Sequence, residues 1–229
     1  MNSKKKYLFI VLILVSFTCK AQLLFNMNDY RNLVYSSGGY SGGFSNITVG
    51  IARREYIRRI KKEVIGIVDI SLPVSNQFFT KYFIKKGFQF DLYKNKDLRL
   101  PFTFASSSIE RQNEFFKYHD ITAEFTINPG IYKEKYTLAL DCRYELIVFR
   151  HIKYSQQYKN DIDSKASNHW TRPLYDILKV GIIGGLNIKK LVVYIKTGYE
   201  RNPSVTNYIP GYIIVGIAFK CGTKPMKMI

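Results

Sequence analysis

The chain has 229 residues and is strongly basic, with 35 lysines and arginines against 17 acidic residues and a formal net charge of +18. Three cysteines are too few for a disulfide scaffold, and the cysteines and histidines lack the spacing of a metal-binding motif. No apolar stretch reaches the roughly 20 residues of a membrane-spanning helix. These features exclude a disulfide-rich toxin-like fold and a helical membrane protein.

The first residues have the pattern of a secretory signal. Lysines at positions 4, 5 and 6 precede the mainly apolar segment Tyr7–Phe17. Cys19 and Ala21 then occupy the third and first positions before a predicted cleavage ahead of Gln22. Cleavage would remove four lysines and lower the formal charge from +18 to +14. We therefore predict a signal peptide over residues 1–21.

Two other interpretations of this segment fit less well. An uncleaved anchor helix would need a longer apolar run to cross a bilayer. Lipid attachment at Cys19 is disfavoured because the bulky Phe17 stands where a small residue is usual. No linker or repeat divides the remaining chain, so residues 22–229 are predicted to form one exported domain.

Alternation of apolar and polar residues is the main signal in this domain. Between positions 44 and 53, for example, Ile47, Val49 and Ile51 share one face, because successive side chains of a strand point to opposite faces. No segment has a convincing helical period. The fold is therefore predicted to be all-β, with strands at residues 32–36, 44–53, 64–72, 82–93, 98–105, 121–128, 136–148, 177–188, 191–200 and 213–219.

The polar face of these strands distinguishes a membrane barrel from a soluble barrel or sandwich. A solvent-facing surface has no use for many tiny residues, whereas the interior of a narrow barrel does, because opposite walls share little space. The apolar face carries large side chains that suit lipid. The tiny residues on the polar face are Gly50, Ala52, Gly87, Ala105, Gly181, Gly185, Gly198, Gly216 and Ala218.

The signal segment, the run of short alternating strands and the closing segment Gly216-Ile217-Ala218-Phe219 resemble small outer-membrane β-barrel proteins of Gram-negative bacteria. That family commonly ends its last strand with an aromatic residue read by the insertion machinery. Phe219 would take this role, although ten residues follow it. The resemblance implies a closed antiparallel up-and-down transmembrane β-barrel in the cell outer membrane, and it carries no catalytic signature.

Gap lengths predict the strand number and the direction of the chain. Bacterial single-chain barrels have an even number of strands, with short periplasmic turns and longer extracellular loops. Counting back places the basic segment 55–61 on the periplasmic side, which requires an ascending strand at 32–36 and a loop at 38–43. Ten strands are preferred, and eight are the alternative. Short gaps lie at 94–96, 129–133 and 189–190, and long gaps at 106–119, 150–175 and 201–211.

Charges of both signs fall on the predicted lumen face, where they should pair rather than line a wide water channel. We therefore expect a narrow, salt-bridged lumen, with a small pore as the alternative. The lumen acids are Asp69, Asp91, Glu124, Asp141, Glu145 and Glu200, and the lumen bases are Arg99, Arg143, Lys179, Lys196 and Lys220. Strands 82–93 and 98–105 should form a hairpin with a three-residue loop, which would place Asp91 opposite Arg99 and Phe88 opposite Phe102.

Residues with catalytic potential gather in or beside the predicted long loops. His119, His151 and His169 are the only histidines. A lipid-trimming enzyme could combine histidine with serine and an acid, but the spacing favours a solvated loop, and Trp170 with Tyr175 is interpreted as a pair of interface aromatics. No catalytic, cofactor-binding or metal-binding residue and no cofactor is assigned. The acids and serines of the last long loop are Ser155, Asp161, Asp163, Ser164 and Ser167.

Three functions remain open at this point. The first is a non-enzymatic outer-membrane barrel with a structural, adhesive or surface-interaction role. The second is a lipid-modifying enzyme of the outer membrane, and the third is a component of an export, conjugation or uptake assembly. The expected partners are outer-membrane lipids and lipopolysaccharide, with other envelope proteins as further candidates. Nucleic acid is not an expected partner, because an exported protein seldom meets it.

Overall fold

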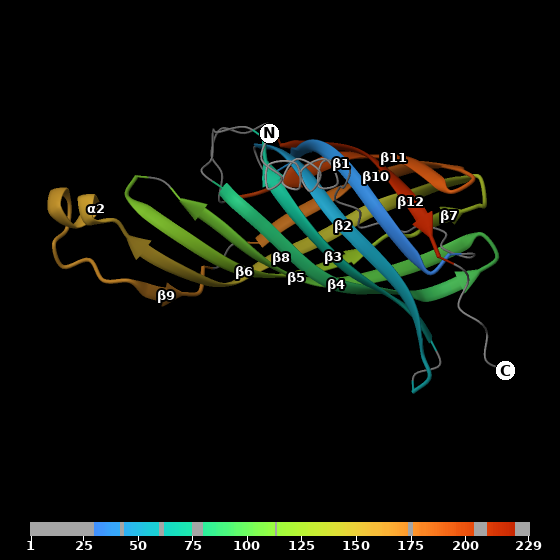
Figure 1. Ribbon diagram of the computed structural model, residues 1–229, viewed down its shortest axis with the longest axis horizontal. Helices are drawn as coiled ribbons and strands as arrows, with labels where there is room; N and C mark the ends of the chain where they lie inside the picture. Colours follow the sequence, from blue (N-terminus) through green and yellow to red (C-terminus); the bar gives the residue numbers. More distant parts are fainter. Residues whose placement is uncertain are drawn as a thin grey trace, which may run out of the picture.

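The computed structural model describes residues 30–41, 44–59, 62–74, 80–112, 114–173, 176–203 and 210–222. These residues form one continuous antiparallel sheet that closes on itself as a barrel (Figure 1). The predicted signal peptide and its cleavage site lie outside the described residues. Within the described part of the chain, no helix has the length and apolar character of a membrane span.

Each of the ten predicted strands is present, and most are longer than the sequence indicated. The wall runs in chain order and closes through hydrogen bonding of β1 with β12 and of β8 with β10. The long strands are β1 (Asn32–Ser41), β2 (Phe44–Ile57), β3 (Lys62–Pro73), β4 (Thr80–Asn95), β5 (Leu98–Gln112), β6 (Phe116–Ile127), β8 (Tyr136–Tyr154), β10 (Asp176–Ile188), β11 (Leu191–Arg201) and β12 (Gly211–Cys221).

Two short strands complete the sheet without adding a position to the barrel. β7 (Gly130–Tyr132) pairs with β5 and β8, as β6 does, so β6 and β7 form one interrupted strand. The interruption falls at Pro129, which has no N–H to donate to a ladder. The predicted turn 129–133 is therefore partly strand. β9 (His169–Thr171) pairs only with the outer part of β8, and ten positions close the barrel.

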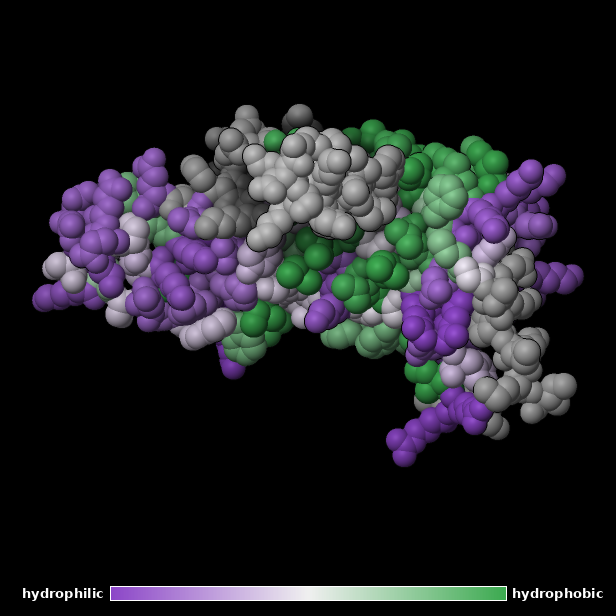
Figure 2. All heavy atoms as spheres, viewed as in Figure 1, coloured by the Kyte–Doolittle hydropathy of each residue, from purple (hydrophilic) through white to green (hydrophobic). Residues whose placement is uncertain are grey.

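The barrel has a polar interior and an apolar exterior. Along β12, Ile213, Val215, Ile217 and Phe219 are exposed, whereas the alternate residues are buried. Figure 2 shows apolar side chains across the middle of the visible wall, between hydrophilic ends. This arrangement is the inverse of a soluble barrel and is that of a small outer-membrane β-barrel. The predicted faces are confirmed: Thr103, Glu124, Asp141 and Gly216 are buried, whereas Phe125, Leu140 and Ile217 are exposed.

Tyrosine rings fill the space left by lumen-facing glycines. Tyr35 is directly opposite Gly50, and a Cβ atom at Gly50 would overlap its ring. Tyr194 is related to Gly216 of β12 in the same way. The predicted role of the tiny residues is thereby explained, because each glycine admits a ring that a larger side chain would displace.

An apolar cluster occupies one end of the lumen. This end, where β1 begins and β12 finishes, is called the termini end, because Asn32 pairs with Cys221 there. Ile65 and Ile67 interrupt the simple alternation in the sequence, and both point into this cluster. The members, all nearly inaccessible to solvent, are Leu33, Tyr35, Ala52, Ile65, Ile67, Val192, Tyr194 and Ala218.

The opposite end of the barrel carries an ordered extension. β5, β6 and β8 continue beyond the barrel wall, and the six-residue helix α2 (Gln156–Asp161) and β9 lie at its tip (Figure 1). The prediction of a long loop over 106–119 was wrong, because β5 reaches Gln112 and β6 starts at Phe116. The predicted loop 150–175 contains the end of β8, the helix and β9. We call this end the α2 end.

The predicted register of the β4–β5 hairpin was also wrong. Asn95 pairs with Leu98, which leaves a two-residue loop of Lys96 and Asp97, with Lys96 at a positive φ of 46°. A register irregularity between Asp91 and Tyr93 then shifts the pairing by one residue. Beyond it, odd-numbered residues of β4 again lie opposite odd-numbered residues of β5, and Asp91 faces Pro101. The Asp91–Arg99 ion pair forms nevertheless, diagonally, at 2.5 Å. The bulge is the physical reason for the error, since it adds a residue on one strand only.

Candidate functional site

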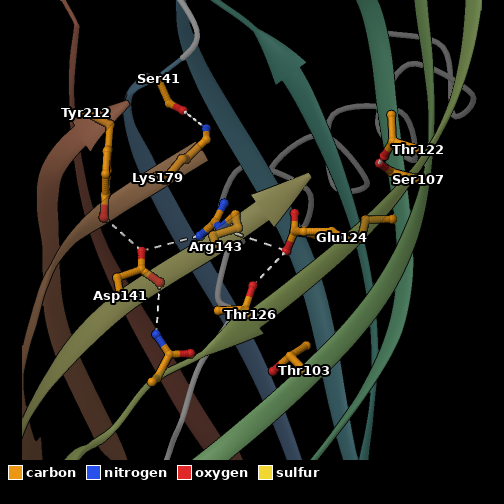
Figure 3. Close-up of polar contacts among 12 residues, drawn as sticks. Ser41, Thr103, Ser107, Thr122, Glu124, Thr126, Asp141, Arg143, Lys179 and Tyr212 are labelled. Carbon is orange, nitrogen blue, oxygen red and sulfur yellow. Dashed lines mark hydrogen bonds and ion pairs between the residues drawn. The ribbon is translucent and has the colours of Figure 1, made fainter. Parts of the chain in front are cut away.

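The centre of the lumen is crossed by a network of ion pairs (Figure 3). Glu124 of β6 lies 3.2 Å from the Lys85 Nζ atom of β4 and 3.9 Å from the Arg143 Nε atom of β8. All three side chains are buried. Lys85 was not among the predicted lumen bases, although its odd number places it on the lumen face of its strand, with Gln89 and Asp91.

A second carboxylate continues the network across the barrel. Asp141 is fully buried and lies 3.5 Å from the Arg143 Nη2 atom. It also accepts hydrogen bonds from the Tyr212 hydroxyl at 3.0 Å and from the Asn128 amide at 2.9 Å. Tyr212 belongs to β12, on the far side of β10 and β11 from Asp141. The contact therefore links two non-adjacent strands, β8 and β12, through the lumen.

A third group of paired side chains lies in the lumen toward the α2 end. Lys179 of β10 lies 3.0 Å from Glu200 and donates a hydrogen bond to the Ser41 hydroxyl at 2.5 Å. Ser41 in turn donates to Glu200 at 2.8 Å. A cavity of about 50 Å³ lies among these side chains and Lys85, which is room for a few water molecules. The expected salt-bridged interior is thus present, and the apolar cluster lies beside it at the termini end.

The outer face of the extension carries a different cluster of charges. On this face, neighbouring cross-strand pairs of β6 and β8 place His119 opposite His151 and Lys117 opposite Lys153. Together with Glu110 of β5, these residues line a pocket of about 130 Å³. We call this set the outer pocket. Its residues lie on the outer side of the strands, the side that faces lipid along the barrel wall. Ile121 and Phe149 are the next pair on this face in the direction of the barrel.

Neighbouring side chains contact three of the residues that line the outer pocket. Glu110 forms an ion pair with Lys117 at 2.8 Å, and the Ser108 hydroxyl lies 3.3 Å from the His119 Nε2 atom. Trp170 of β9 stacks on His151, with ring centroids 4.7 Å apart. Desolvation first, and then the charges of Lys153, His119 and His169, lower the pKa of His151. These effects favour the neutral form of the His151 ring.

The inner face of the extension is structural. Arg150 donates two hydrogen bonds to Asp120, at 2.6 and 2.9 Å, and lies over the ring of Tyr118. Burial raises the pKa of the Tyr118 hydroxyl. Tyr158 of α2 packs against Tyr154, with centroids 4.8 Å apart, and against the β5–β6 turn. These contacts explain why a segment predicted as a loop is ordered.

The loop residues considered for catalysis have local roles. The Ser155 hydroxyl caps α2 by accepting a hydrogen bond from the Tyr158 N–H, and Asp163 accepts one from the Lys165 N–H. His169 lies beside Tyr154, and its Nδ1 atom is 3.0 Å from the backbone carbonyl oxygen of Ser167. Among the described residues, no group of three or more histidines, cysteines or acids has the arrangement of a metal site. Trp170 is 56% exposed at the tip, while Tyr175 lies outside the described residues.

The outer pocket was missed because β6 was predicted to begin too late, at residue 121, and β8 to end too early, at residue 148. The alternation of Phe116, Tyr118 and Asp120 with Lys117 and His119 is present in the sequence. It would have shown that the strand continues. A register irregularity lies in β8 opposite Ile121 and Thr122. Beyond Val148 the odd-numbered residues of β8 therefore face outward, whereas before it the even-numbered residues do, and alternation alone did not indicate this change.

Comparison with known proteins adds no family assignment. No family model matches the sequence, and no curated protein matches it. Among solved structures, the translocator domain of the autotransporter NalP from Neisseria meningitidis is 13% identical with a TM-score of 0.44, over 96% of this chain and 95% of that one. The transport unit of the autotransporter AIDA-I from Escherichia coli is 8% identical with a TM-score of 0.29, over 93% and 97%.

Proposed function

We propose that this protein is a non-enzymatic outer-membrane barrel that displays its ordered extension at the cell surface in a structural, adhesive or surface-interaction role. The observation that carries the proposal is the filled lumen. Buried charges that already have partners inside the protein offer a solute little room or binding energy, and the apolar cluster occupies lumen space at the termini end. The lumen therefore serves as a rigid support and not as a passage.

Conductance across planar lipid bilayers tests the filled lumen. The folded mature chain should give no stable channel events, whereas Tyr35→Ala combined with Tyr194→Ala should introduce leakage by opening the apolar cluster. Migration on gels with and without boiling verifies that both proteins are folded. Stable ion conduction by the unsubstituted protein would contradict the proposal.

Cell-surface labelling tests location and orientation. In a background in which Cys142 and Cys221 are replaced by serine, Lys165→Cys in the extension should react with an impermeant maleimide on intact cells. Arg59→Cys, in the β2–β3 turn at the termini end, should react only after the outer membrane is permeabilised. Equal labelling of both positions on intact cells would refute this orientation.

A lipid-modifying enzyme is the second candidate, favoured by the hydrogen bond between Ser108 and His119. In such an enzyme, Ser108 Oγ would attack an ester carbonyl while His119 Nε2 takes its proton and returns it to the leaving alcohol, and water would then release the acyl group. No carboxylate of a described residue hydrogen-bonds the His119 ring, so the usual orienting acid is missing. Release of fatty acid from phospholipid micelles that disappears in Ser108→Ala would establish this activity.

A further inference from the structure

The outer pocket places two lysines of like charge in direct opposition, with a pair of histidines beside them. Lys117 faces Lys153 and His119 faces His151 across the same pair of strands. Like charges opposite each other destabilise a sheet. Glu110 is paired with Lys117 at 2.8 Å, and within the described part of the chain no carboxylate forms an ion pair with Lys153. The pocket therefore has an excess of positive charge that an external anion would neutralise.

The height of the pocket on the barrel indicates where that anion comes from. On β8, lipid-facing residues run from Leu138 to Phe149, and His151 and Lys153 follow on the same face. At about 3.3 Å per residue this segment is about 36 Å long. A tilt of about 40° reduces it to about 28 Å of height, close to the roughly 25 Å apolar band of such barrels. The pocket thus lies just beyond the apolar band, at the level of the lipid head groups.

We propose that the outer pocket binds the phosphate group of a lipid head group in the membrane leaflet at the α2 end. A phosphate carries a charge of about −1.5 to −2 and three strong acceptor oxygens. Lys153 and Lys117 supply point charges on flexible stems, and the two histidine rings supply N–H donors. Trp170, stacked on His151, adds the amphipathic ring that favours a membrane interface.

The residue types favour an anion over the other ligands that histidines commonly take. No described group of three histidines, cysteines or acids is arranged for a metal, and lysines do not share a metal site readily because their charge opposes the ion. Glu110 is held by Lys117, so it does not face the pocket as an isolated negative charge. This inference rests on the proposed membrane location, because the lipid source depends on it.

The single tryptophan gives a direct experiment. The mature chain, folded in a neutral detergent, is titrated with short-chain phosphatidic acid while Trp170 fluorescence is recorded. Saturable binding is expected, with phosphatidylcholine much weaker. Lys153→Gln should weaken binding by about tenfold or more, the size expected for losing a charge-assisted hydrogen bond. Lys165→Gln, an equal charge change elsewhere in the extension, should alter it less than about twofold.

Each other outcome has one meaning. Equal responses to phosphatidic acid and phosphatidylcholine, or equal effects of the pocket variant and Lys165→Gln, would overturn the assignment. If inorganic phosphate binds as tightly as the lipid, the ligand is free phosphate and the lipid source is wrong. Ser108→Ala should bind normally, which separates lipid binding from hydrolysis. If the unsubstituted chain shows no gel shift on boiling, it is the barrel proposal that fails.

Discussion

The lumen and the outer pocket are both rich in charge, but they balance it in opposite ways. In the lumen, Glu124 is shared by Lys85 and Arg143, and Asp141 is held by Arg143 and Tyr212. In the outer pocket, the cross-strand pair Lys117 and Lys153 carries charges of the same sign, and one carboxylate, Glu110, lines the pocket with them. Charges removed from water must be paired within the protein, whereas charges at a membrane surface can be neutralised from outside.

Removing a lumen acid should have the largest effect. Glu124→Gln leaves Lys85 and Arg143 buried without its charge, so the barrel should lose about 3–5 kcal/mol of stability. The folded fraction on unboiled gels during a urea titration measures the loss. Glu114→Gln, the same change on an exposed acid in the extension, should stay within about 0.5 kcal/mol. Similar losses for both variants would mean that the lumen network contributes no more than a surface charge.

A charge placed on the lipid side should rank second. Leu140→Arg puts an arginine on the exposed apolar wall, opposite Ile182 of β10. The expected cost is about 2–4 kcal/mol if Leu140 lies near the bilayer midplane, and less near an interface. Unfolding titrations in phospholipid vesicles measure it, with Leu140→Ala as the control for lost packing. A stabilising or neutral arginine would be incompatible with a lipid-facing wall.

The fit between tyrosines and glycines in the lumen gives the third prediction. Gly50→Ala places a methyl group against the Tyr35 ring and should cost about 1–3 kcal/mol through overpacking. The double variant with Tyr35→Leu should recover part of this loss, because the collision is removed. Additive losses in the double-mutant cycle would show that the two positions do not interact.

The smallest effect is expected in the outer pocket, and it has the opposite sign. Lys153→Glu replaces a like-charge pair by an opposite-charge pair with Lys117 and should stabilise the protein by about 0.5 kcal/mol at low salt. Salt should reduce the gain, because the side chains are exposed. Thermal unfolding of the two proteins at low and high salt provides the measurement. A lower melting temperature for Lys153→Glu would indicate that the pocket is already neutralised.

The periodic pattern of the sequence was sufficient for the barrel but not for its details. Alternation identified all ten strands, their two faces and most of the charges in the lumen network, because lipid and a narrow lumen impose opposite demands on neighbouring residues. It did not reveal the bulges near Leu92 and Val148, where one strand gains a residue and the parity changes. The position of Asp91 opposite Pro101 followed from the first of them.

The outer pocket depended on tertiary structure for a different reason. His119 and His151 are 32 positions apart in the sequence, and the ladder that places them opposite each other begins beyond the predicted ends of both strands. That ladder is held by the Arg150–Asp120 pair and by the aromatic packing of Tyr158 on the inner face. By itself, the sequence determined which residues face lipid and which face the lumen, because that choice is local and repeats every second residue. Only the folded chain decided which charges meet, because partners on different strands are set by register and by packing across the sheet.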